Sequence, residues 1–157
     1  MSIVPIKSLF ETHLTVRDLD ASIAFYSGVV GLEVAHRVAE RHAAFLWIGR
    51  PGQAMLGLWS HHTSPLWMRL HLAFAVDAAH VIASVDRLRK AGVTPRDGSG
   101  LVTDEPDVIA WMPALSVYFD DPDGHSLEFI SMLDEPPRPG LGFVPLSRWR
   151  ATASGSE

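Results

Sequence analysis

Cysteine is absent from this sequence of 157 residues, and basic residues are fewer than acidic ones. Without cysteine, disulfides, thiolate metal sites and cysteine nucleophiles are excluded. The 13 lysines and arginines stand against 18 aspartates and glutamates, which gives a formal net charge of -5. That balance argues against nucleic acid or an anionic membrane as the main partner, because both require a basic face. A small molecule is therefore the expected ligand.

Long apolar runs are missing as well. A membrane-spanning helix needs about 18 consecutive apolar residues, and the sequence has no such run. The opening stretch "MSIVPIKSLFETH" lacks the basic region and apolar segment of a signal peptide. With 47% hydrophobic and 20% charged residues, the composition is that of a globular protein. We expect a cytoplasmic protein with one compact domain, or two small halves that share a core.

The chain contains an internal repeat. Residues 9–60 and 67–131 each read as a strand, a helix and further strands. The second copy opens with "MRLHLAFAV", continues with a helix over residues 78–91, and ends with the strands "ALSVYFD" and "HSLEFISML" after a polar loop. Superposing Pro51 on Pro122 also superposes Leu56 on Leu127, and it places Glu128 opposite Gly57.

The opening strands of the two copies each carry a histidine. Because neighbouring side chains of a strand point to opposite faces, His71 lies opposite the apolar face of "RLHLAFAV". In "FETHLTV", His13 shares a face with Glu11 and Thr15. We interpret the two histidines as matching positions of the repeat, on the face that does not pack against the helix.

Three motifs in order, "THLTVRDLDASIAFYSGVVGLEV", "HLAFAV" and "VYFDDPDGHSLEFI", resemble the vicinal oxygen chelate superfamily. Its members include glyoxalase I, extradiol dioxygenases, fosfomycin-resistance thiol transferases and metal-free bleomycin-binding proteins. The resemblance implies an α+β fold in which two paired βαβββ modules, residues 8–60 and 66–133, form a cup-shaped mixed sheet. Residues 134–157 would be a C-terminal extension with a disordered end.

The resemblance also implies where a divalent metal would bind. The family's ligand positions fall on His13, Gly57, His71 and Glu128, and a glycine offers no ligand. The remaining set of His13, His71 and Glu128 suits Fe2+ or Mn2+, with Zn2+ or Ni2+ as alternatives. Taken singly, each of these three residues is better explained by a structural role in a sheet, whereas the three together at matching positions of the repeat favour a metal site.

Four further residues are candidates for the site. Tyr118 resembles a tyrosine that supplies a proton or positions oxygen in related enzymes, and a packed strand tyrosine is the alternative. Thr15, Arg69 and Trp111 are candidate substrate contacts. Thr15 equally suits a plain strand position, Arg69 a surface or interface, and Trp111 the core or a dimer contact.

Two classes of function remain open. The first is a metalloenzyme that binds a small substrate through paired oxygens, with dioxygenase-like chemistry favoured over glyoxalase-like lyase or fosfomycin-type transferase chemistry. The second is a metal-free protein that binds drugs or aromatic compounds. The tryptophans and the apolar tail "GLGFVPLSRW" favour a homodimer. The proline-rich tail is predicted to be an ordered wrap without a helix.

Overall fold

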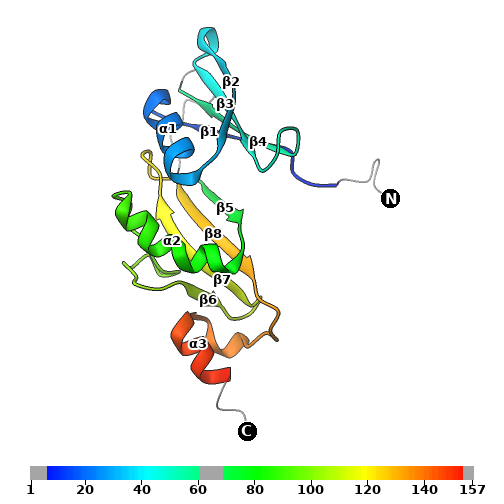
Figure 1. Cartoon of the computed structure of the whole chain (residues 1–157), viewed down its shortest axis with the longest axis vertical. Coiled ribbons are helices and arrows are strands. Elements are labelled where there is room, and N and C mark those ends of the chain that lie inside the picture. The colour runs from blue at the N-terminus through cyan, green and yellow to red at the C-terminus, as the bar shows by residue number, and fades with distance from the viewer. Residues whose placement is uncertain (1–6, 61–68, 154–157) are drawn as a thin grey trace. The chain divides into compact units, whose positions relative to one another are not determined.

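The computed structural model describes residues 7–60 and 69–153 of the chain (Figure 1). The chain divides into two compact units between residues 68 and 69, which we call the first and the second module. Each module holds one sheet with a helix on one face, so the predicted α+β fold of two βαβββ modules is confirmed. Among the helices of the described residues, none is long and apolar enough to cross a membrane.

The first module forms a four-stranded sheet. Its elements are β1 (Glu11–Thr15), α1 (Leu19–Phe25), a π-helical turn (Tyr26–Val30), β2 (Glu33–Val38), a 3-10 turn (Ala39–Arg41), β3 (Ala43–Ile48) and β4 (Ala54–Trp59). The strand order is β1-β4-β3-β2, with β1 parallel to β4 and the other pairs antiparallel. Along each strand, every second side chain therefore points to the same face of the sheet.

Local sequence explains how the first module is built. The Asp18 side chain accepts a hydrogen bond of 2.9 Å from the backbone N–H of Ala21 and so caps the start of α1. Gly31, with a φ of 86°, ends the helical segment in the left-handed conformation that suits glycine. Leu14, Leu56 and Leu58 are buried on the helix side of the sheet. We call the opposite face, which the helix does not cover, the open face of the module.

The second module repeats this plan with an extra edge strand. Its elements are β5 (His71–Ala75), α2 (Ala78–Lys90), β6 (Asp107–Ile109), β7 (Ala114–Asp120), β8 (Ser126–Met132), a 3-10 turn (Pro139–Leu141), β9 (Phe143–Pro145) and α3 (Leu146–Ala153). The order is β5-β8-β7-β6-β9, and β5 is parallel to β8. The predicted helix over 78–91 matches α2, whose buried Val81, Val85 and Leu88 face the sheet.

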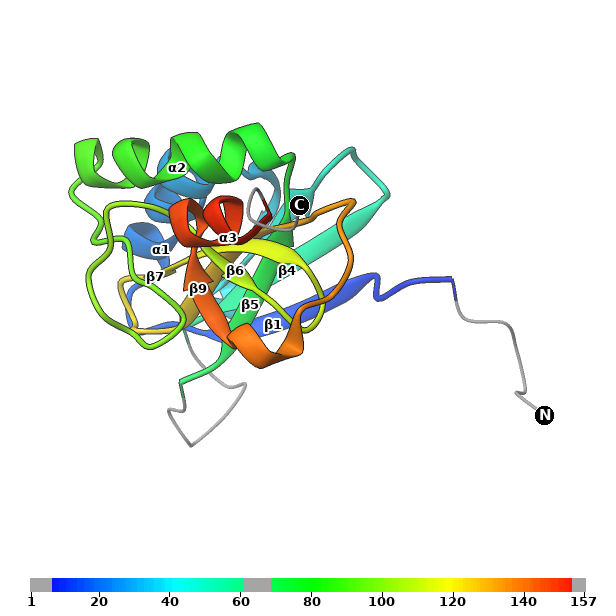
Figure 2. The ribbon, with the colours of Figure 1, turned by 90° about the horizontal axis from the view of Figure 1, so that it is seen from below.

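The C-terminal extension is ordered, but the prediction that it contains no helix is wrong. Strand β9 pairs with β6, and α3 follows it directly (Figure 2). Trp149 of α3 is fully buried, its indole N–H donates to Glu135 at 2.9 Å, and the Arg138 guanidinium lies 3.9 Å from the ring centroid. The prolines all precede α3, so they do not interrupt it. The end predicted to be disordered was "ASGSE", residues 153–157; Ala153 is instead the last residue of α3, and residues 154–157 lie outside the described residues.

Candidate metal centre

His71 and Glu128 form a close pair on the open face of the second module. His71 Nε2 lies 3.1 Å from Glu128 Oε2, and Glu128 is only 4% exposed. His71 Nδ1 lies 3.0 Å from the carbonyl oxygen of Ser126. Because a carbonyl oxygen only accepts, Nδ1–H donates to it, and Nε2 is the ring nitrogen that faces the carboxylate. An imidazole nitrogen and a carboxylate oxygen both bind divalent ions, so this pair is a candidate for two ligands of one ion.

Hydroxyl groups surround Glu128 in the second module. Fully buried Ser116 donates its Oγ–H to Glu128 Oε1. Tyr118 lies directly opposite Glu128 in the β7–β8 pairing. Burial is the main cause that raises the pKa of Tyr118 to about 12, the charge of Glu128 adds to it, and a hydrogen bond with Ser116 opposes it. The phenol therefore stays protonated at neutral pH and acts as a hydrogen-bond donor.

Ser116 and Asp107 were not among the predicted site residues. Asp107 lies beside Ser116 in the β6–β7 pairing and is 6% exposed. Burial raises its pKa, as do the charges of Asp97 and Glu105, while a hydrogen bond of 3.0 Å from the backbone N–H of Gly98 lowers it. Parity in "ALSVYFD" places Ser116 on the face of Tyr118, and that signal was available from the sequence.

His13 forms a second imidazole–carboxylate pair in the first module. Its Nε2 lies 3.0 Å from Oε1 of Glu11, and both side chains are partly exposed. A Cβ placed on Gly57 would lie 2.5 Å from Cδ2 and 3.0 Å from Nε2 of His13. The His13 ring thus occupies the space where a side chain at position 57 would begin. The buried indole N–H of Trp59, which has no hydrogen-bond partner in the described parts of the chain, lies 3.2 Å from the same point.

Strand pairing corrects one interpretation of the repeat. His71 pairs with Ser126 in β5–β8, whereas His13 pairs with Gly57 in β1–β4. Superposing Gly57 on Glu128 places Met55 on Ser126, and Glu11 is the residue that pairs with Met55. Glu11 therefore corresponds to His71. The interpretation that His13 and His71 occupy matching positions is wrong by two residues.

Each module offers two ligand atoms of types that bind divalent ions, an imidazole nitrogen and a carboxylate oxygen. Over residues 7–60 and 69–153, the His, Asp and Glu side chains do not assemble into groups of three or more that would hold a metal ion. The second-module pair fits a metal by its ligand types and by its buried, hydrogen-bonded carboxylate. The first-module pair fits by its donor types.

The three predicted substrate contacts, Thr15, Arg69 and Trp111, differ in how close they lie to the imidazole–carboxylate pair of their own module. Thr15 shares the face of His13, two residues further along β1, and pairs with Trp59. Arg69 forms an ion pair with Asp120, to which Arg96 also extends at 3.3 Å. Trp111 is 60% exposed and lies in the turn before β7. His71 pairs with Ser126, which pairs with Asp120 at the C-terminal end of β7, whereas Trp111 precedes the N-terminal end of β7. The second module therefore does not bring Trp111 beside His71.

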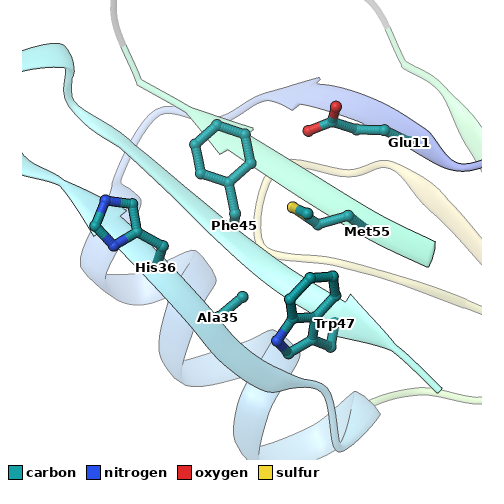
Figure 3. A pocket seen from close by; sticks show the side chains of 6 residues that line it. All are labelled: Glu11, Ala35, His36, Phe45, Trp47 and Met55. Atoms are coloured by element: carbon teal, nitrogen blue, oxygen red, sulfur yellow. The ribbon is translucent and has the colours of Figure 1, made fainter. Parts of the chain in front are cut away.

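The open face of the first module carries an apolar pocket of about 330 Å³. Figure 3 shows Phe45 and Trp47 of β3 at its centre, flanked by Met55 of β4. Glu11 and His36 lie at its two sides. Pockets of this size and lining bind the apolar part of small molecules, and here a carboxylate of one imidazole–carboxylate pair borders the pocket.

The sequence matches the family model described as the Glyoxalase/Bleomycin resistance protein/Dioxygenase superfamily over residues 8–129. The chain belongs to this superfamily. The match spans both βαβββ modules and ends just beyond Glu128, so the C-terminal extension lies outside it.

Particular relatives cover most of the chain. A lactoylglutathione lyase of Salmonella typhimurium is 26% identical over 133 residues, which is 80% of this chain and 93% of that protein. An integron cassette protein, HFX_CASS4, from the mobile metagenome of the Halifax Harbour sewage outfall is 31% identical with a TM-score of 0.66, over 81% of this chain and all of the other. The structure titled Oxidase ChaP-H2 is 25% identical with a TM-score of 0.63, over 85% and 98% of the two chains.

Proposed function

We propose that the protein is a divalent-metal-dependent enzyme of the vicinal oxygen chelate type, with His13, His71 and Glu128 as metal ligands. The observation that carries this proposal is the His71–Glu128 pair, in which an imidazole nitrogen lies 3.1 Å from an oxygen of a buried carboxylate while the other imidazole nitrogen donates to the Ser126 carbonyl. Fe2+ or Mn2+ is the expected ion, with Zn2+ or Ni2+ as alternatives.

A bound divalent ion would polarise the paired oxygens of a substrate. The residues of the second module then have separate tasks. Ser116 holds one oxygen of Glu128, which fixes the orientation of the carboxylate. The protonated phenol of Tyr118, opposite Glu128, donates a hydrogen bond to a substrate oxygen on which negative charge develops. His71 keeps Nδ1 protonated through the Ser126 carbonyl.

The substrate is proposed to be a small molecule with an apolar or aromatic part. The pocket formed by Phe45, Trp47 and Met55 supports this, because it offers flat and flexible apolar side chains beside Glu11 (Figure 3). Thr15, on the face of His13, is a candidate contact for a polar substituent. Arg69 is engaged by Asp120, and Trp111 lies away from His71, so both are weaker candidates for substrate contacts.

Two reactions are candidates at such a centre. With three protein ligands, enough positions stay open for dioxygenase-like chemistry on an aromatic substrate. The aromatic pocket and the relative titled as an oxidase support this first candidate. The second candidate is lyase-like chemistry. It is favoured by Glu11, a further carboxylate 3.0 Å from His13, and by the lactoylglutathione lyase relative.

Metal binding by the purified protein tests the proposal. Protein prepared without added metal is analysed for bound ions, stripped with a chelator and titrated with Mn2+, Fe2+, Zn2+ and Ni2+. We expect the parent to bind one ion per metal site and Glu128→Gln to lose this binding. Asp86→Asn, on the exposed side of α2, is the matched control and should bind as the parent does. Equal binding by the parent and Glu128→Gln would refute the metal centre. Binding of aromatic compounds by a metal-free parent would then support the binding-protein class.

A homodimer is proposed as the assembled form. Exposed apolar side chains support it, among them Trp111 at 60% and Met132 at 66% exposure. Both lie at the same end of the second sheet, because Met132 pairs with Ala114 just after the Trp111 turn. Sedimentation at micromolar concentration is expected to give twice the chain mass, and a species of 17.2 kDa would contradict the proposal.

A further inference from the structure

Asp107 is a buried carboxylate that the proposed mechanism does not use. It is 6% exposed and lies on the open face of the second module, because it pairs with Ser116, whose hydroxyl reaches Glu128 on that face. A buried carboxylate is normally paired with a cationic group. Within residues 7–60 and 69–153, however, Asp107 forms no ion pair, and its carboxylate accepts one hydrogen bond, from the backbone N–H of Gly98 at 3.0 Å.

The charges nearest to Asp107 are negative. Burial is the main cause that raises the pKa of Asp107, and the charges of Asp97 and Glu105 add to it, while the hydrogen bond from Gly98 opposes it. The Arg96 guanidinium, from the same loop as Asp97, extends to Asp120 at 3.3 Å instead. The described part of the second module therefore leaves the charge of Asp107 unbalanced.

The C-terminal extension helps to enclose Asp107. Strand β9 pairs with β6 and places Pro145 beside Asp107. The ring of Phe143 packs so closely on Gly98 that a side chain at position 98 would collide with it. Gly98 in turn directs its N–H to the carboxylate. The family match ends at residue 129, so the extension that completes this enclosure lies outside it.

The structural role of Asp107 does not require its charge. An asparagine has nearly the same shape, and its side-chain carbonyl oxygen accepts a backbone N–H as a carboxylate does. A neutral amide also avoids the free-energy cost of burying a charge near two other carboxylates. The negative charge of Asp107 thus destabilises the fold without a structural return. That pattern is typical of a residue that acts on a ligand.

We propose that Asp107 binds a protonated amino group of the substrate. An ammonium group supplies hydrogen-bond donors together with the positive charge that Asp107 lacks, whereas a neutral hydroxyl supplies a donor alone. The inference rests on the proposed function in taking the open face of the second module as a face that binds substrate. It narrows the proposed substrate to a small molecule that carries an amine.

Two probes of nearly equal size test the proposal. Benzylamine is protonated at neutral pH and benzyl alcohol is uncharged. Each is titrated into the metal-free full-length chain, and the backbone amide signal of Gly98 is followed by NMR. We expect the parent to bind benzylamine at least about 10-fold more tightly than benzyl alcohol, because hydrogen bonds to charged groups are the stronger ones.

Asp107→Asn is expected to lose the preference for benzylamine, and Asp86→Asn, at an exposed position of α2, is expected to keep it. Equal binding of the two probes by the parent overturns the inference. A preference that survives in Asp107→Asn overturns it as well.

Thermal unfolding separates a ligand role from a structural one. Asp107→Asn should unfold at a higher temperature than the parent while it loses the preference for benzylamine. Asp107→Ala, which cannot accept the N–H of Gly98, should lose both stability and preference. If Asp107→Asn is destabilised as much as Asp107→Ala, the charge serves the fold and the inference is wrong.

Glu128→Gln separates this inference from the metal centre. Glu128 is the alternative partner for an ammonium group in metal-free protein. A preference that is lost in Glu128→Gln and kept in Asp107→Asn therefore contradicts the proposal. Asp107→Asn should bind Mn2+ as the parent does, and a loss of Mn2+ affinity in this variant would assign Asp107 to the metal centre and overturn the inference. If the parent binds no metal but keeps a preference that depends on Asp107, the proposed function fails and the amine site stands.

Discussion

The two modules share one strand plan but present different chemistry on their open faces. Matching the strand registers pairs each residue of one open face with its counterpart in the other. The first-module residues Val38, Ala43, Phe45, Trp47, Met55 and Gly57 correspond to Asp107, Ser116, Tyr118, Asp120, Ser126 and Glu128. Each of these six apolar or small residues of the first face has a polar counterpart in the second, whereas Trp59 corresponds to the apolar Ile130.

This difference indicates a division of labour within a duplicated fold. The polar face of the second module holds its carboxylate through Ser116 and offers the Tyr118 phenol. The apolar face of the first module forms the pocket around Phe45 and Trp47. In the proposed enzyme, the second module would supply hydrogen bonds for charge that develops on a substrate, and the first would supply an apolar surface for the rest of the substrate.

The largest expected effect concerns the extension that only the second module has. Trp149→Ala removes a fully buried indole and its stacking with Arg138, and should destabilise the second module by about 3–5 kcal/mol. Chemical denaturation followed by circular dichroism measures the loss. Exposed Arg148→Ala in the same helix serves as the control. A loss below about 1 kcal/mol in Trp149→Ala would show that the extension contributes little to the module.

The next largest effect concerns kcat, which should depend on Tyr118 of the second module but not on its counterpart Phe45 of the first. Tyr118→Phe removes the phenol that donates toward the substrate, and should lower kcat by about 100-fold without changing metal affinity. Phe45→Tyr adds a hydroxyl to the apolar face and should leave kcat close to that of the parent. Steady-state kinetics on an identified substrate, with metal titration in parallel, measures both. A parent-like kcat in Tyr118→Phe would place the chemistry elsewhere.

A smaller effect is expected from the pocket. Trp47→Ala removes part of the apolar lining and should raise KM by about 10-fold, at roughly 25 cal/mol per Å² of lost contact, with kcat nearly unchanged. Trp111→Ala, in the exposed turn of the second module, is the matched control and should leave both constants unchanged. If the two variants behave alike, the apolar pocket is not where the substrate binds.

The smallest effect is a change in pH dependence at Asp107. Burial raises the pKa of this carboxyl, so its ionisation costs more in the folded state than in the unfolded one. Asp107→Asn should therefore stabilise the second module at pH 7, and the gain should disappear as the pH falls toward 3.8, where the parent carboxyl is protonated. Thermal unfolding at pH 7 and near pH 4 checks this. If Asp107→Asn stabilises the protein equally at pH 7 and near pH 4, the raised pKa of Asp107 is not the cause.

Sequence periodicity was sufficient for the larger elements of the fold. Helix α2 and the longer strands follow from apolar spacing and from turn residues, which act locally, while the full βαβββ order was implied by the resemblance to the superfamily. Strands β6 and β9 have three residues each, too few for a periodic signal. Helix α3 was missed because the prolines before it were applied to the whole tail, although they do not restrict the residues that follow.

The sequence predicted which face of β1 carries the candidate ligands, but not which residue of that face corresponds to His71. Alternation places Glu11 and His13 on the same face, so it cannot tell which of the two corresponds to His71. That answer depends on which residue pairs with Gly57, and pairing between distant strands leaves no local pattern in the sequence. Ser116 was visible by parity, but its bond to Glu128 required the β7–β8 register.

The edge strands β2 and β9, one in each sheet, bear on the risk of aggregation. An unpaired strand edge can recruit strands from other chains and seed fibrous assembly. Strand β9 ends the second sheet with only three residues, the last of them Pro145, which lacks a backbone N–H. Strand β2 ends the first sheet with Glu33 and Arg37 and a bulge between Val34 and His36. Each module thus resists unwanted growth at this edge of its sheet, the second module through the shortness and proline of β9 and the first through the charge and irregular pairing of β2.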